Sequence, residues 1–201
     1  HANYKKKDIA GMTASEQLEK INERTRELVT LQYNTYNRSL VPLMHQHGIV
    51  VIDAFEDLSE SQAAFVDRYF EDNVYPVLTP MAVDASRPFP LIRNKTLNIA
   101  ALLSKKKGKA EKEEIEFATV QVPSVLPRLV HIPSEDGNEK TFILLEQVIE
   151  RNIDKLFLNY DVLCAYPYRV MRNADLSIDE DEAADLLKEI QKQLKMRQWG
   201  E

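Results

Sequence analysis

The chain has few glycines and almost no cysteine, and both shortages narrow its chemistry. Its five glycines form neither a G-x-G-x-x-G nor a G-x-x-x-x-G-K-[ST] motif, which excludes phosphate binding by those two loops. The single cysteine, Cys164, cannot form an internal disulfide and is expected to be a small buried side chain. No apolar stretch approaches the roughly 18 residues of a membrane-spanning helix. The first residues also lack the apolar segment of a signal peptide. We therefore expect a cytoplasmic protein without a transmembrane segment.

Basic residues are outnumbered as well. The 201 residues contain 26 Lys and Arg against 32 Asp and Glu, a net charge of −6 that disfavours a general nucleic-acid binder. Hydrophobic residues make up 44% of the chain, enough for a core and too many for a disordered protein. The chain does not begin with Met, so we expect an excised piece of a longer protein.

The first segment is predicted to be one long helix. Thr13 or Ser15 can cap its start, Gly48 is a natural stop, and Pro42 is expected to kink its last turns. Its apolar positions at helical spacing need a packing partner and include Leu18, Ile21, Leu28 and Leu31.

A second helix is predicted by the capping box of Ser59 and Gln62. It is expected to end near Val74, because Pro76 should restrict Tyr75 to extended geometry.

Strand-like and helical patterns alternate irregularly beyond a proline-rich entry at residues 76–90. A short β-branched run at 49–52 precedes the second helix, and further strand-like runs follow at 97–103, 116–122, 128–132 and 162–171. Helices are predicted at 144–157 and 179–198. This order predicts an α+β fold, with an N-terminal helical segment followed by a mixed or antiparallel sheet domain packed with helices and covered on one face.

No catalytic, cofactor-binding or metal-ligating residue is predicted. His45 and His47 lie two apart near a helix end and would point in different directions, and His131 is expected at the surface. The acidic run 179–182 resembles a metal site, but carboxylates at the start of a helix are also favoured by the helix dipole.

One stretch reverses the overall sign of charge. Residues 87–109 hold seven cations and no carboxylate. The stretch is either a solvated loop with a basic hairpin tip or a surface that attracts a polyanion.

Several blocks of the sequence resemble the bacterial long-chain polyphosphate kinase family, in order and spacing. The first blocks are Tyr75-Pro76-Val77-Leu78-Thr79-Pro80, Ala82-Val83-Asp84 and Arg87-Pro88-Phe89-Pro90, with Asn94, Leu97 and Asn98. Val122-Pro123, Leu126-Pro127-Arg128 and Phe142-Ile143-Leu144-Leu145-Glu146 continue the match. The last blocks are Ala165-Tyr166-Pro167-Tyr168-Arg169-Val170, Arg172-Asn173-Ala174-Asp175-Leu176, and Asp179-Glu180-Asp181-Glu182 leading into Leu186-Leu187.

The resemblance implies a role in a four-domain cytoplasmic enzyme. Such kinases reversibly move the terminal phosphate of ATP onto polyphosphate, with magnesium and a phosphohistidine intermediate. The resemblance places the phosphorylated histidine, the magnesium ligands and most ATP contacts in two C-terminal domains. It assigns residues 1–70 to the end of the helical N-terminal domain and residues 71–201 to the head, or middle, domain.

We therefore expect a chain that is inactive on its own but belongs to an ATP:polyphosphate phosphotransferase. Its expected partners are the remaining kinase domains, a second copy in a homo-oligomer, and polyphosphate, with no nucleic acid. Arg87, Arg93 and Lys95 are the predicted polyphosphate contacts. The alternative is a stand-alone interaction or dimerisation module with the same fold.

Overall fold

The computed structural model describes residues 7, 9–83, 90, 92–105, 115–134 and 139–171. The chain divides into two compact units, one of residues 1–50 with 136–140 and one of residues 51–135 with 141–201. Each unit is described separately below. No helix within the described ranges is both long enough and apolar enough to cross a membrane.

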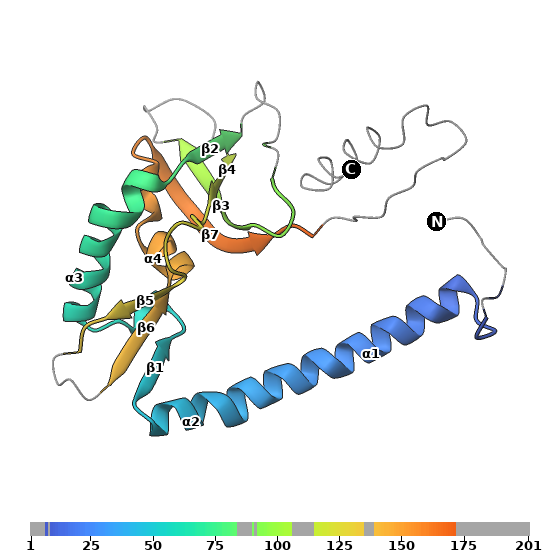
Figure 1. The fold of residues 1–201 in the computed structure, drawn as a ribbon. Coiled ribbons are helices and arrows are strands. Elements are labelled where there is room, and N and C mark those ends of the chain that lie inside the picture. Colours follow the sequence, from blue (N-terminus) through green and yellow to red (C-terminus); the bar gives the residue numbers. More distant parts are fainter. Residues whose placement is uncertain are drawn as a thin grey trace, which may run out of the picture. The chain divides into compact units, whose positions relative to one another are not determined.

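The first unit is dominated by the predicted long helix (Figure 1). Thr13 caps α1 (Ala14–Thr35) in a reciprocal capping box with Glu16. A π-helical turn (Tyr36–Leu40) and α2 (Val41–Gln46) continue the helical backbone, and Gly48 follows with φ 68°. The predicted start and stop are therefore confirmed, since glycine adopts this left-handed conformation without steric cost.

Both predicted helices adjust to a proline in the same way. The π-helical turn before Pro42 closes with Val41 N–H donating to Tyr36, and the one before Pro76 closes with Tyr75 N–H donating to Phe70. A proline ring clashes with the carbonyl four residues earlier and cannot donate to it, so the wider turn relieves the conflict.

The expected extended geometry of Tyr75 is wrong. Ser59 and Gln62 form the predicted capping box at the start of α3 (Glu60–Tyr69), which a π-helical turn (Phe70–Val74) continues. Tyr75 has φ −51° and ψ −43° and begins a short 3₁₀ turn, Tyr75–Val77. Helical geometry persists because Pro76 occupies the first turn of this element, where no N–H is needed.

The described residues form seven strands in two sheets, rather than in the single sheet expected. The smaller sheet has the order β1-β6-β5, from β1 (Ile49–Ile52), β5 (Leu129–Ile132) and β6 (Lys140–Leu144). The larger has the order β2-β4-β3-β7, from β2 (Pro80–Val83), β3 (Leu97–Lys105), β4 (Ile115–Gln121) and β7 (Tyr160–Arg169). Every neighbouring pair in the larger sheet is antiparallel, as is β5 with β6. The α+β class with an N-terminal helical segment is confirmed.

Two of the observed strands, β2 and β6, were not predicted, and one helix is shorter than expected. β2 begins at a proline, which an edge strand tolerates at its first residue. β6 is formed by the residues that lead into the expected helix. That helix is only α4 (Leu145–Arg151), followed by a 3₁₀ turn at Ile153–Leu156. Asn152 leaves helical geometry at φ −109° and ψ 15°, and its side-chain amide donates to Asp67 and to the Val148 carbonyl. The amide competes with the helix for backbone hydrogen bonds. The expected helix 179–198 and residues 106–114 of the expected basic hairpin tip lie outside the described residues.

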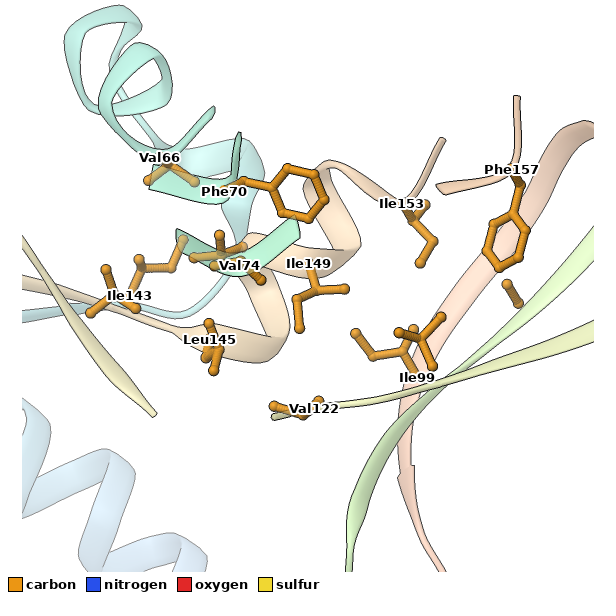
Figure 2. Close-up of a cluster of buried hydrophobic side chains, with 14 of the residues drawn as sticks. Val66, Phe70, Val74, Ile99, Val122, Ile143, Leu145, Ile149, Ile153 and Phe157 are labelled. Carbon is orange, nitrogen blue, oxygen red and sulfur yellow. The ribbon is translucent and has the colours of Figure 1, made fainter. Parts of the chain in front are cut away.

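The core of the second unit joins its helices to both sheets. Val66, Phe70 and Ile149 from the helical segments are 0% exposed, as are Ile99 of β3 and Ile143 of β6. Figure 2 shows these side chains converging between the ribbons. Along β3 the alternate residues Ile99, Ala101 and Leu103 are buried, so one face of the larger sheet closes the core.

Candidate anion-binding surface

A tight turn positions two of the three predicted polyphosphate contacts. The Thr96 N–H and hydroxyl both donate to the Arg93 carbonyl oxygen, at 3.3 and 2.8 Å. Between them Lys95 has φ 64°, a left-handed conformation that costs a non-glycine residue about 1–2 kcal/mol. The turn leads directly into β3, and the side chains of both Arg93 and Lys95 are exposed.

Buried and backbone groups hold this turn in place. The Asn98 side chain is 1% exposed, and its amide donates to the Thr96 carbonyl at 3.0 Å and to the Thr96 hydroxyl at 3.1 Å. The Lys95 N–H donates to the Val170 carbonyl at 2.8 Å, just beyond the end of β7. Because these bonds fix the backbone from two sides, the strained conformation of Lys95 persists.

The pairing of β3 with β7 brings a third cation to the same corner. Arg169 lies opposite Leu97 in the antiparallel register and is exposed. We call Arg93, Lys95 and Arg169 the β3–β7 cation surface; the two strands lie side by side in Figure 1. Sequence reasoning missed Arg169, which is remote in sequence. The available signal was its place at the end of a predicted strand, but the pattern did not reveal that strand's partner.

The other end of the same strands is electrically balanced. Lys105 Nζ lies 3.8 Å from Glu116 Oε1, and Asp161 pairs with Ser104 in the register. A strand of this length separates the two ends by about 30 Å. The cation-rich stretch of the sequence is therefore divided between distant ends of β3. Arg87, the remaining predicted contact, lies outside the described residues, as do Lys106, Lys107 and Lys109.

The other candidate groups are dispersed. His45 and His47 are exposed at the end of α2, and exposed His131 places its ring 5.3 Å from Phe142. Among the described residues, no three His, Cys, Asp or Glu side chains form a group that could hold a metal ion. The acidic run 179–182 falls outside them. Cys164 is half-buried rather than fully buried, because it lies on β7, a strand at the edge of the larger sheet.

α4 carries a second electrostatic feature, formed by two buried carboxylates. Glu146 is 4% exposed and accepts hydrogen bonds from Arg128 Nε at 3.1 and 3.2 Å. Glu150 accepts one from the Gln147 amide at 3.1 Å. Burial, together with the charges of Glu146 and Glu56, raises the pKa of Glu150 to about 7. Arg128 thus neutralises the Glu146 carboxylate, while the Glu150 carboxyl takes up a proton more readily than an ordinary glutamate.

The helical first unit and the antiparallel sheets that follow it match a known class of proteins. Residues 1–52 match the family model of the polyphosphate kinase N-terminal domain, and residues 61–201 match that of the polyphosphate kinase middle domain. The chain therefore belongs to the polyphosphate kinase family.

Individual relatives agree with this assignment. The chain is 51% identical over 198 residues to the polyphosphate kinase of Lactiplantibacillus plantarum, covering 98% of this chain and 27% of that protein. It is 37% identical over 204 residues to polyphosphate kinase 1 of Chlorobaculum tepidum, covering 99% and 28%. The crystal structure of polyphosphate kinase from Porphyromonas gingivalis shares the fold, with a TM-score of 0.66 and 24% identity over 90% of this chain and 30% of that one. The chain thus spans about a quarter of the length of these relatives.

Proposed function

We propose that this chain supplies the N-terminal and middle domains of an enzyme that reversibly transfers the terminal phosphate of ATP to polyphosphate. The proposal rests on the order of the two family matches along the chain, the N-terminal domain first and the middle domain second. The chain covers 27% of its L. plantarum relative. In this proposal the phosphohistidine, magnesium and most ATP contacts belong to other domains. The residues present here buttress those domains. The domain boundary near residue 70 and the cytoplasmic location remain predictions.

Packing in the second unit suits such a supporting role. Arg151 Nε and a terminal guanidinium nitrogen donate to the two oxygens of Asp67 at 2.8 and 3.0 Å, which joins α4 to α3. Lys155 Nζ donates to Glu71 at 2.7 Å and adds a second link. Paired hydrogen bonds between planar groups fix orientation as well as distance. A domain held in this way can present its surfaces to neighbouring domains in a defined geometry.

An activity measurement tests the proposal. The 201-residue chain is incubated with ATP, magnesium and polyphosphate, and the full-length L. plantarum relative serves as the positive control. We expect transfer by the control and neither transfer nor a phosphorylated side chain in the 201-residue chain. Turnover, or a covalent phosphate detected by mass spectrometry, would overturn the proposal.

The stand-alone module is separated from this proposal by the gene. A reading frame that continues past Glu201 into segments with further His and Arg residues supports a kinase part. A stop codon directly after Glu201 supports an independent interaction module.

Self-association is part of the same proposal. The α1 side chains of Leu18, Ile21 and Leu28 are 60%, 58% and 50% exposed. Because burying apolar surface is favourable, we assign this face to a contact with a second copy of the chain. Sedimentation should show a dimer whose population falls when the three residues are replaced by serine. A monomer at high concentration would contradict this assignment.

A further inference from the structure

We infer that the β3–β7 cation surface holds a segment of a polyphosphate chain. The polyanion is identified through the proposed function, whereas the location and composition of the surface come from the fold. Arg169 is the addition that the fold makes to the cations expected from the sequence.

The anchored backbone that carries these charges favours a linear polyanion. Arg93 and Lys95 extend from one hydrogen-bonded turn, and the Lys95 N–H is anchored to the residue that follows Arg169. Within the described part of the chain, neither Lys95 nor Arg169 forms an ion pair. A chain of repeating phosphates can contact several cations at once and release a counterion at each contact.

The distribution of charge along the sheet gives this surface a direction. Lys105, at the opposite end of β3, lies 3.8 Å from Glu116. Asp161 adds a second carboxylate at that end, opposite Ser104 in the register. In a chain of net charge −6, the β3–β7 cation surface is therefore a local positive region on a largely acidic protein. Long-range attraction would guide an anion to one end of the sheet rather than spread it along β3.

Aromatic placement favours polyphosphate over a single-stranded nucleic acid. Proteins that hold single strands combine cations with aromatic rings on which bases stack. Residues alternate between the faces of a strand, so Arg169 lies on the opposite face of β7 from Tyr168 and Tyr166. The Tyr168 hydroxyl is also hydrogen-bonded to Thr119 at 2.7 Å. Tyr168 is thus engaged within the sheet, and neither tyrosine shares a strand face with Arg169.

Binding of long-chain inorganic polyphosphate to the 201-residue chain tests the inference over a series of salt concentrations. One variant carries Arg93→Gln, Lys95→Gln and Arg169→Gln. The matched control carries Lys20→Gln, Arg26→Gln and Arg38→Gln, exposed cations of the first unit, and has the same net charge. At 0.1 M salt each lost phosphate contact should weaken binding about fivefold, or about 100-fold for three. The slope of log K against log salt should become shallower by about 2. The control should bind nearly as the parent does.

The outcomes separate this inference from the proposed function, because binding is measured without phosphate transfer. Equal weakening in both triple variants would show general attraction and overturn the inference. Single-stranded DNA of similar length, bound by the parent as tightly as polyphosphate, would also overturn it. If the triple variant of the β3–β7 cation surface does not fold, the single variant Arg169→Gln tests the inference instead. We expect it to bind polyphosphate about fivefold more weakly than the parent. Unchanged binding would contradict the inference. Phosphate transfer by the 201-residue chain, which would overturn the proposed function, would leave the interpretation of these binding data unchanged.

Discussion

The backbone N–H of Lys95 donates to the carbonyl oxygen of Val170 at 2.8 Å, across 75 residues of sequence. This bond fixes the turn before β3 against the end of β7 and brings Lys95 beside Arg169. The cation surface is therefore a product of strand pairing, and its rigidity depends on a residue held at positive φ.

The strained turn predicts an unusual order of stabilities at position 95. Lys95→Gly should be more stable than Lys95→Ala by about 1 kcal/mol, because only glycine adopts positive φ without a steric penalty. Urea unfolding of the two variants measures the difference directly. An alanine variant as stable as the glycine variant would show that this backbone conformation carries no strain.

The buried carboxyl of Glu150 predicts a stability that depends on pH. Its pKa is raised to about 7 in the folded chain, above the ordinary value of 4.5 expected after unfolding. The folded state thus binds the proton more tightly, and the resulting stabilisation is present at acidic pH and is lost as pH rises through 7. Glu150→Gln should flatten this decline between pH 5 and 8 and raise stability at pH 8. Exposed Glu19→Gln is the control, and equal pH slopes in parent and Glu150→Gln would contradict the assignment.

The Asp67–Arg151 pair predicts the opposite pH behaviour. The hydrogen bond from Arg151 lowers the pKa of Asp67 from its ordinary 3.8, so the pair stabilises the fold above that pH and the benefit is lost as pH falls through the lowered pKa. Asp67→Asn should cost about 1 kcal/mol at pH 7, an effect that shrinks in acid. The more exposed Lys155–Glu71 pair provides the comparison, and Glu71→Gln should cost less. Equal losses in both variants at pH 7 would contradict the greater weight given to the partly buried pair.

The core predicts a large loss from a single truncation on α4. Ile149 is 0% exposed among the side chains of Figure 2, so Ile149→Ala should destabilise the second unit by about 2–5 kcal/mol. Val125→Ala removes a side chain of the same unit that is 77% exposed and should change stability by less than about 0.5 kcal/mol. Thermal unfolding followed by circular dichroism separates the two variants, and a comparable loss at Val125 would contradict the central place given to Ile149 in the core.

Local signals in the sequence predicted where helices begin and end when the cause lies within a few residues. The capping residues Thr13 and Ser59 and the stop at Gly48 act through hydrogen bonds or backbone angles within a few residues. β6 and the early end of α4 were not predictable in this way. The amide of Asn152 reaches Asp67, 85 residues earlier, and that contact exists only after the helices pack.

The sequence by itself determined the family, the long first helix, the alternation that marks β3 and the cations Arg93 and Lys95. These follow from local propensity, periodicity and the order of motifs. Only the tertiary structure decided that two sheets form, that Arg169 joins those cations and that Lys105 is paired with Glu116 at the far end. The reason is physical: strand register places residues distant in sequence side by side, and periodicity along one strand does not specify its partner.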